Sequence, residues 1–486
     1  MIGERSLIAL VERFYGVRHM VRPSLQKGEL PSTGQAYRDV IRIAIPAVAE
    51  MVLMALIGAM DTAMVGILGA EAISAVGLPG QPRMIMLAVF FALNVGVTAV
   101  VARRKGEGRQ EDANRTLRNA LIVIFLLSLA IMAVSLNQAR NMILLASGDV
   151  DPADLTNVRV INDAVAYFKW MAYALPINAV TMCINAAQRG IGKTKATMAV
   201  NVASNLVNVV FNYLLIGGNF GFPRLGVEGA AIATFIGFCV GLVLAVLSIM
   251  LPRYSGFLRL RIKDDWRLDK TTLRDISRVG GSAMLEQICL RIGFLLYARL
   301  IYEALHDPVA FASHQIGMQF LNISFTFGDG IGIAGTSLVG QMLGKQRPDL
   351  GMVYGKVSQR MALTVSMGLL LVFIPLRHLL VTPFASDAQV LALAAQVMIM
   401  VGIFQPFQTS SVVISGCLRG AGDTRYVAVV MMLCVTLIRP ILAWSALFPL
   451  QLGLLGAWAG SLIDMMIRLT FMYVRFTKGK WMYIRV

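Results

Sequence analysis

The sequence has few charged residues for its length. Charged residues make up 15% of the 486 residues, hydrophobic residues make up 57%, and the mean hydropathy is +0.69. Soluble domains have about 25% charged and about 45–50% apolar residues. This composition excludes a soluble protein and predicts an integral membrane protein.

The chain also has few residues that could bind a metal or act as nucleophiles. All five cysteines lie within apolar stretches, none of them forms a CxxC pair, and the chain has only four histidines. A disulfide framework and a zinc site are therefore excluded. The HExxH and GxSxG motifs are missing as well, so nothing indicates an intramembrane enzyme. We expect no enzymatic activity, no cofactor and no bound metal.

Long apolar runs fill almost the whole chain. A helix needs about 20 apolar residues to cross about 30 Å of hydrocarbon. Twelve runs of this length begin near residues 43, 84, 119, 164, 196, 227, 274, 310, 357, 390, 426 and 454. We predict an all-α integral membrane protein with twelve transmembrane helices. The segment before the first run lacks the pattern of a signal peptide, so we expect a cytosolic N-terminal segment.

The net charge of +17 reflects where the loops lie rather than a nucleic-acid partner. When loops are assigned alternately to the two sides of the membrane, one side receives 34 of the 44 lysines and arginines. The opposite loops hold four, namely Arg140, Arg159, Arg224 and Arg377. By the positive-inside rule, both termini are predicted to be cytoplasmic. The basic loops then face anionic lipid, and we expect no nucleic acid as a partner.

Two segments of the chain repeat each other. PINAVTMCINAAQRGIGKTK at 176–195 matches PFQTSSVVISGCLRGAGDTR at 406–425 in its proline, Arg-Gly pair, second glycine and threonine. Further matches pair GVEGAAIATFIG with GLLGAWAGSLID, and IPAVAE with GSAMLE. The last match places Glu50 opposite Glu286. Two parallel six-helix copies of this kind are typical of transporters that move substrate between two lobes.

The repeat divides the chain into five parts. We predict a cytosolic segment at 1–40, an N-lobe at 41–251, a basic cytoplasmic linker at 252–273, a C-lobe at 274–476 and a cytosolic tail at 477–486.

Two acidic residues lie within the first predicted helix. Glu50 and Asp61 are eleven residues apart, which is about three helical turns, so both point to the same face. An ionisable residue inside the membrane is costly and usually marks function. Because burial favours the neutral form of a carboxyl group, these positions suit proton or cation coupling. A carboxyl group that only caps a kink is the alternative.

The fifth predicted helix carries four amides on one face. Asn201, Asn205, Asn208 and Asn212 follow each other at intervals of 4, 3 and 4 residues, which places them on a single stripe. Such a stripe must face protein or a water-filled cavity rather than lipid. Hydrogen bonding between helices is the alternative role.

The second half carries other charges inside its predicted helices. Glu286, Arg291 and Asp329 would form either a buried ion-paired set or the wall of a polar cavity. Asp464 and Arg468 are four residues apart in the favourable order, so we expect them to pair with each other.

These features together resemble one transporter family. The resemblance rests on the two six-helix copies and on four motifs: MDTAMVG (60–66), QRGIGKTK (188–195), GVEGAAIAT (226–234) and CLRGAGDTR (417–425). The chain resembles the multidrug and toxic compound extrusion (MATE) family over about residues 40–476. The resemblance implies export of amphipathic, often cationic compounds in exchange for H⁺ or Na⁺ by two rocking lobes.

The resemblance also implies roles for particular residues. Asp61 corresponds to the helix 1 aspartate that takes part in proton or cation binding, and Thr234 corresponds to the threonine of the GAAIAT motif. Asn208 and Asn212 correspond to a motif in which an Asn is followed four residues later by an Asp. Here Asn212 replaces that Asp, so this chain keeps one carboxylate of two, which weakens a Na⁺ site.

We therefore predict a secondary active exporter of amphipathic, cationic organic compounds, coupled to H⁺ or Na⁺. Asp61, Asn208, Asn212 and Thr234 would couple the ion. Five other residues would line the substrate cavity: Glu50, Asn205, Glu286, Arg291 and Asp329. We expect a monomer in the plasma membrane, the inner membrane of a bacterium, with a small-molecule substrate and the lipid bilayer as partners. The alternative is a flippase or exporter of a lipid-linked or anionic substrate, which the second-half arginines would favour.

Overall fold

The described part of the chain is helical throughout. The computed structural model describes residues 12–147, 155–251, 256–261, 263–385 and 387–484, and these residues form helices and turns without a β-strand. The prediction of an all-α fold is confirmed for them. Parts of the predicted N-terminal segment, linker and C-terminal tail lie outside these residues.

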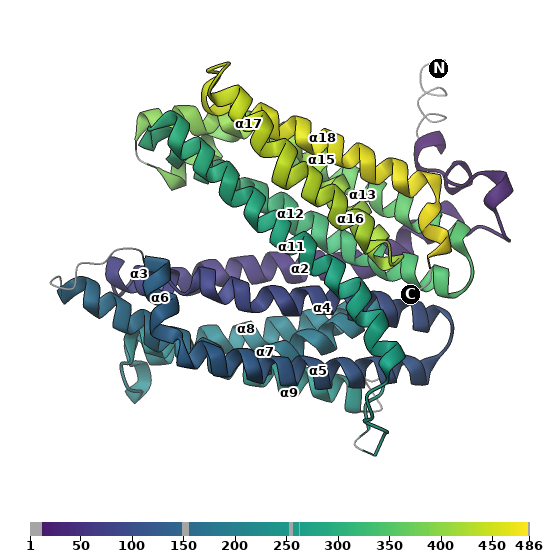
Figure 1. The fold of residues 1–486 in the computed structure, drawn as a ribbon, viewed down its shortest axis with the longest axis horizontal. Coiled ribbons are helices and arrows are strands. Elements are labelled where there is room, and N and C mark those ends of the chain that lie inside the picture. Colours follow the sequence, from purple (N-terminus) through teal and green to yellow (C-terminus); the bar gives the residue numbers. More distant parts are fainter. Residues whose placement is uncertain (1–11, 148–154, 252–255, 262, 386, 485–486) are drawn as a thin grey trace. The chain divides into compact units, whose positions relative to one another are not determined.

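The first half contains the following helices (Figure 1): α2 (Thr33–Gly66), α3 (Ala70–Gly77), α4 (Gly80–Gly106), α5 (Gln110–Asn137), α6 (Ala139–Ser147), α7 (Leu155–Gly190), α8 (Thr194–Gly217) and α9 (Gly226–Met250). Short 3₁₀ turns lie at Val17–His19 (η1), Pro23–Leu25 (η2) and Asn219–Gly221 (η3).

The second half contains α11 (Lys270–Leu305), α12 (Pro308–Gly344), α13 (Pro348–Phe373), α14 (Arg377–Val381), α15 (Ala388–Gly420), α16 (Thr424–Met431), α17 (Arg439–Leu447) and α18 (Gly453–Lys478). A π-helical segment, η5 (Met432–Ile438), joins α16 to α17. Pro440 at the start of α17 has no N–H to donate, which accounts for an irregular turn here. Further 3₁₀ turns are η4 (Thr382–Phe384) and η6 (Lys480–Tyr483).

Every one of the twelve predicted runs begins in a helix of this structure. Among the described residues, nine helices are long and apolar enough to cross a membrane. The runs in α7, α11 and α12 belong to helices of 36, 36 and 37 residues that are not among these nine, because they contain more polar or charged residues. The chain is a multi-pass membrane protein, and the count of twelve spans stays a prediction.

Two compact units divide the chain. Unit 1 comprises Met1–Val48, Ala102–Gly108 and Gly281–Val486, and unit 2 comprises Ala49–Val101 and Arg109–Gly280. Helices α2, α4 and α11 each contribute residues to both units. The boundaries of these units differ from those of the two lobes expected from the repeat, 41–251 and 274–476, which stay a prediction.

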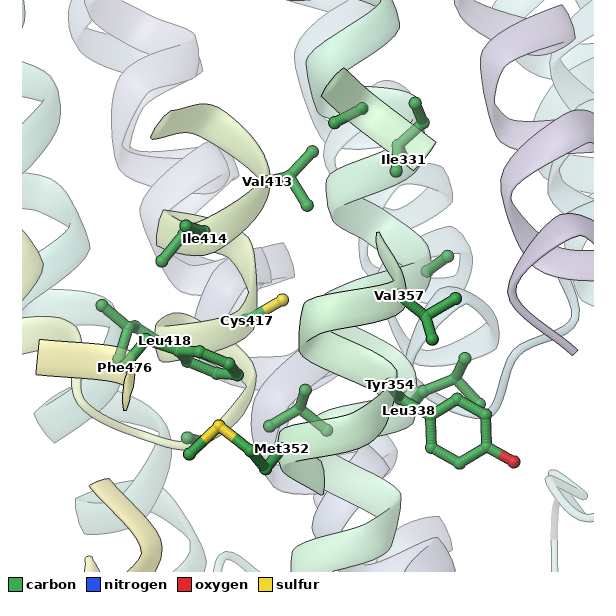
Figure 2. Close-up of a cluster of buried hydrophobic side chains, with 14 of the residues drawn as sticks. Ile331, Leu338, Met352, Tyr354, Val357, Val413, Ile414, Cys417, Leu418 and Phe476 are labelled. Carbon is green, nitrogen blue, oxygen red and sulfur yellow. The ribbon is translucent and has the colours of Figure 1, made fainter. Parts of the chain in front are cut away.

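An apolar core holds unit 1 together (Figure 2). It joins α12 through Ile331 and Leu338 to α15 through Val413 and Leu418, and it continues to Phe476 of α18. Figure 2 shows side chains from α12, α13 and α15 meeting in one cluster. Apolar burial of this kind fixes the helices that carry the charged residues described below.

The N-terminal segment packs on the same unit. Val17 and Met20 are buried in its core, Lys356 Nζ donates to the Met20 carbonyl at 2.6 Å, and the Lys27 backbone N–H donates to Asp349 at 3.0 Å. Residues 12–32 are therefore part of unit 1.

The repeated motifs form equivalent turns. Gly192 follows α7 with φ +80°, and Gly422 follows α15 with φ +86°. Glycine adopts this left-handed conformation without steric cost. The second glycine that the two motifs share thus allows the chain to reverse between consecutive helices in each copy.

Candidate functional site

Asp61 of α2 lies among amides of α8 in unit 2. Asn212 Nδ2 donates to Asp61 Oδ1 at 2.8 Å. The Asn208 amide lies between Asp61 and Thr234. With its nitrogen facing Asp61, Nδ2 donates to both carboxylate oxygens at 3.0 Å, and its oxygen accepts from the Thr234 backbone N–H and hydroxyl at 3.1 Å. The structure therefore brings together the four residues predicted to couple the ion.

Two residues that the sequence analysis did not single out belong to the same surroundings. The Tyr167 hydroxyl and the Thr234 hydroxyl are hydrogen-bond partners, and the positive charge of Arg83 acts on both Asp61 and Tyr167. Arg83 opens an apolar run and Tyr167 lies within another. An aromatic or a single cation in such a run does not reveal which carboxylate it will approach.

Glu50 forms a second polar set in unit 2. Its carboxylate is fully buried and pairs with Arg189 of α7. It also accepts from Asn201 Nδ2 at 2.6 Å and from the Thr197 hydroxyl at 2.9 Å. Three donors therefore hold this carboxylate, and it is an ion-paired group rather than an open one.

The amide stripe of α8 links both sets. Asn201 reaches Glu50 and Asn212 reaches Asp61, each across 151 residues of sequence. Identical separations mean that α2 and α8 run in the same direction in constant register. Asn205, between the two sets, donates to the Asn201 carbonyl at 2.7 Å.

An equivalent ion pair lies in unit 1. Arg419 Nη2 donates to Glu286 Oε1 at 2.6 Å, and Arg419 Nε lies 3.3 Å from Oε2. Arg189 and Arg419 are the matching arginines of the two repeated motifs. The same acid therefore pairs with the same motif arginine in each copy, as the alignment of Glu50 with Glu286 implies. The sequence analysis recorded both arginines as matches but assigned them no partner.

The other predicted cavity residues of unit 1 are exposed. Arg291 of α11 and Asp329 of α12 both have exposed side chains in the middle of long helices. Asp329 also acts electrostatically on Arg419. Of the two arrangements that the sequence left open, Glu286 fits the buried ion-paired set, whereas Arg291 and Asp329 are exposed on the unit.

The predicted pair between Asp464 and Arg468 is wrong. Asp464 instead accepts from Arg439 at 2.7 and 3.0 Å, and Arg468 Nη2 donates to Gln408 Oε1 at 2.9 Å. Both acceptors lie on other helices than their donors. Helical spacing alone favours an i, i+4 pair, but neighbouring helices supplied better-placed partners here.

The Asp61 set has no equivalent at the matching positions of the second copy. The alignment that matches Glu50 with Glu286 matches Asp61 with Tyr297, and the second-half partner of Thr234 is Ser461. Tyr297 and Ser461 are both buried, and neither hydroxyl has a hydrogen-bond partner among the described residues. Asn208 and Asn212 are matched by Ile438 and Leu442. The carboxylate and its amides therefore occur in one copy of the repeat.

Comparison with known proteins identifies the chain. The family model described as MatE matches residues 46–214 and residues 283–445, one match in each half of the chain. The chain belongs to the MATE family. Members of this family are transporters, so the protein is a transporter and not an enzyme.

Curated relatives cover nearly the whole chain. It is 28% identical to a protein described as probable multidrug resistance protein NorM from Thermotoga maritima, over 95% of this chain and 97% of that protein. It is 26% identical to multidrug resistance protein MdtK from Yersinia enterocolitica, over 80% of this chain and 82% of that one.

Solved MATE structures share the fold. A multidrug resistance MATE family transporter in an outward-facing conformation matches with a TM-score of 0.83 and 20% identity, over 92% of this chain and 97% of that one. A transporter from Pyrococcus furiosus, whose description refers to reversed polarity of its binding pocket, matches with a TM-score of 0.82 and 19% identity over the same shares. At this identity the likeness establishes the fold of this MATE protein.

Proposed function

We propose that this MATE transporter exports amphipathic, cationic organic compounds in exchange for protons, and that Asp61 is the coupling residue. The observation that carries the proposal is the Asp61 set, in which one carboxylate has two amide neighbours, Asn208 and Asn212. The family membership and the multidrug-resistance names of the relatives support the drug-export part.

The composition of the Asp61 set favours H⁺ over Na⁺. Cations such as Na⁺ require several oxygen ligands, and carboxylates are the strongest of these in an apolar site. The set has one carboxylate, since Asn212 stands where a second acid would be, and the charge of Arg83 already acts on Asp61. A proton needs a single carboxylate oxygen, so protonation is the simpler way to neutralise Asp61.

Coupling would follow from the contacts that protonation removes. An ionised Asp61 accepts hydrogen bonds from α8, whereas a neutral carboxyl group accepts them more weakly. Proton uptake would therefore loosen α2 from α8, whose Asn208 also contacts Thr234 of α9. In the proposed mechanism, this change accompanies the rocking of two lobes, 41–251 and 274–476, between inward-facing and outward-facing states.

The substrate cavity is proposed to include Glu50, Asn205, Glu286, Arg291 and Asp329. Charged side chains exposed in mid-helix positions avoid lipid and face water, which supports Arg291 and Asp329 most directly. Glu50 and Glu286 would act through their arginine partners. Unchanged transport after joint substitution of Glu50, Asn205 and Glu286 would remove these three from the cavity.

The location and topology form part of the same proposal. Twelve spans with both termini in the cytoplasm, in the plasma membrane, agree with the distribution of basic loop residues. We propose that one chain forms the working unit, since each set of polar contacts described above is complete within one chain.

The proposal is tested by efflux from proteoliposomes. A fluorescent cationic dye is loaded, and a pH gradient or a Na⁺ gradient is imposed on vesicles with the native chain, with Asp61→Asn or with Asp163→Asn. Asp163 is an exposed carboxylate of the same unit, so its variant is a matched control. We expect efflux with the pH gradient, loss of at least about tenfold in Asp61→Asn, and no change in Asp163→Asn. Equal efflux by both variants would refute the role of Asp61.

Exposed Arg291 favours a second candidate function, the export of an anionic or lipid-linked substrate. An arginine can bind a carboxylate or phosphate through two parallel hydrogen bonds. If the native chain moves an anionic dye but no cationic dye under the same gradients, this second candidate replaces the first.

A further inference from the structure

Arg468 is a buried cation that forms no ion pair with a carboxylate in the described part of the chain. Its side chain lies in α18 and is 2% exposed. Nη2 donates to the neutral Gln408 at 2.9 Å, and Nη1 lies 3.6 Å from Met431 Sδ. Its Nε–H has no hydrogen-bond partner among these residues. Burying an ion without a counter-charge is strongly unfavourable.

The two acids whose charges act on Arg468 are Asp464 and Glu286, and each is paired with another arginine. Arg419 donates to Glu286. Arg439 donates twice to Asp464 Oδ2, both residues are buried, and Asp464 Oδ1 has no hydrogen-bond partner among the described residues. Two guanidinium groups and one carboxylate leave this cluster of Arg439, Asp464 and Arg468 with one positive charge in excess. The excess lies inside unit 1, away from solvent.

The first copy of the repeat has no charges at the matching positions. The sequence repeat aligns GVEGAAIATFIG with GLLGAWAGSLID. In this alignment Asp464 corresponds to Gly237 and, one helical turn later, Arg468 corresponds to Gly241. In unit 2 these glycines allow close contact between α9 and α8, since a Cβ on Gly237 would lie 2.8 Å from the Ser204 carbonyl. At these positions the first copy of the repeat therefore has glycines that let two helices pack closely, whereas the second copy has the charged cluster.

Two unused N–H donors flank the bond between Arg468 and Gln408. Arg468 Nε lacks an acceptor, and so does Gln408 Nε2, although Gln408 is fully buried. Buried donors are nearly always satisfied, by protein or by a bound species. The π-helical segment η5 ends at Ile438, next to Arg439, and such segments are frequent at functional sites.

We propose that unit 1 binds a small monovalent inorganic anion, chloride under cellular conditions, between Arg468 and Gln408. An anion supplies the missing negative charge and accepts from both unused donors. A water molecule could accept the same hydrogen bonds but would leave the excess charge in place. A larger organic anion would not fit beside side chains that are at most 2% exposed. This anion site is separate from the Asp61 set and independent of the proposed transport function.

Thermal unfolding of the full chain in detergent tests the proposal. The transition is compared in sodium chloride and in sodium gluconate at equal ionic strength and pH, because gluconate is too bulky for the site. A ligand that binds only the folded state raises the unfolding temperature in a saturable way. We expect the native chain to unfold about 3 °C higher in chloride, and bromide to replace chloride.

Two variants and one control test whether the effect of chloride on the unfolding temperature arises at Arg468 and Gln408. Arg468→Met removes the cation and should abolish the chloride dependence. Gln408→Glu provides a built-in carboxylate, so the variant should be as stable in gluconate as the native chain is in chloride. The control is Arg299→Met, since Arg299 is exposed and paired with Glu303, and it should keep the full chloride dependence.

The position of the anion site is found by soaking crystals of the native chain in bromide and locating the bromide by anomalous scattering. The proposal requires a peak within hydrogen-bond reach of Arg468 Nε and Gln408 Nε2. It is overturned if the native chain is equally stable in chloride and gluconate, or if Gln408→Glu responds to chloride as the native chain does. A bromide peak elsewhere in unit 1 with none at Arg468 overturns it as well.

Discussion

Asp61, which is half-buried, differs in its neighbours from the fully buried acids of this MATE protein. Glu50, Glu286 and Asp464 each pair with an arginine, namely Arg189, Arg419 and Arg439. The hydrogen-bond donors at Asp61 are neutral amides. A carboxylate held by amides can be neutralised by a proton without leaving an arginine unpaired, so Asp61 is the acid best suited to gain and lose charge during transport.

The identity of residue 212 should determine the coupling ion. Asn212→Asp places a second carboxylate beside Asp61, and paired carboxylates attract a cation more strongly. We expect dye efflux driven by a Na⁺ gradient to rise at least about fivefold, as measured in proteoliposomes. Asn141→Asp, which changes an exposed amide of α6 in the same unit, is the control and should show no such rise. If Asn212→Asp leaves the response to Na⁺ unchanged, residue 212 does not select the ion.

The pair between Glu50 and Arg189 should matter more to stability than a surface pair. Arg189→Met leaves the fully buried Glu50 without its cation, which costs about 3 kcal/mol of stability. The double variant Glu50→Leu with Arg189→Met should recover most of this loss, because no charge is then left unpaired. Thermal unfolding in detergent measures the stability of the single and the double variant, and Arg115→Met, at an exposed arginine, is the control. A double variant less stable than Arg189→Met would contradict this reasoning.

At this scale the sequence predicted which residues lie together around Asp61 better than it predicted the ion-pair partners in the second half. Asp61, Asn208, Asn212 and Thr234 were selected by position in a motif, and the structure brings them together. Arg468 was assigned to the acid one turn away, yet it bonds Gln408 on another helix. Contacts between helices depend on how the faces pack, which local spacing does not specify.

Among the helices, α11 has a well-defined start. Asp269 precedes it and accepts hydrogen bonds from the Thr271 and Thr272 hydroxyls at 2.6 Å and from the Thr272 backbone N–H at 3.0 Å. This is the pattern of an N-cap. The hydrogen bonds from Thr271 and Thr272 hold the pKa of the Asp269 carboxyl below its ordinary value.

Asp269→Ala should therefore destabilise the protein in a pH-dependent way. Loss of an N-cap costs about 1 kcal/mol. Because the folded-state pKa is lowered, the contribution of Asp269 is complete above the ordinary pKa near 4 and is lost as the pH falls below it. The difference in unfolding temperature between the native chain and the variant should be constant from about pH 6 to 8 and shrink below about pH 4. A difference that grows on acidification would show that Asp269 acts otherwise.

Helix positions were predicted well because hydropathy determines them. Each predicted run begins in an observed helix, although several helices begin earlier than their apolar runs, among them α2, α5, α7, α11 and α13. Their first turns are polar and contribute no hydropathy signal, which explains the shift. Polar and charged residues spread along α7, α11 and α12 keep these three helices outside the nine most apolar ones.

For the whole molecule, the two copies of the repeat have kept one feature and lost another. The pairs of Glu50 with Arg189 and Glu286 with Arg419 are equivalent, whereas the Asp61 set occurs in the first copy and the Arg468 cluster in the second. A feature kept in both copies suits the common scaffold. Features found in one copy suit the separate tasks that we assign to them, ion coupling and anion binding.

The central claim is that Asp61 exchanges a proton for each export cycle. The most direct measurement is proton movement driven by substrate: proteoliposomes with a trapped pH indicator receive a gradient of the cationic substrate and no pH gradient. For the native chain, we predict that the internal pH changes as substrate leaves, and for Asp61→Asn, that it does not change although the substrate still binds. Substrate movement by the native chain without a pH change, or an equal pH change with Asp61→Asn, would contradict the account.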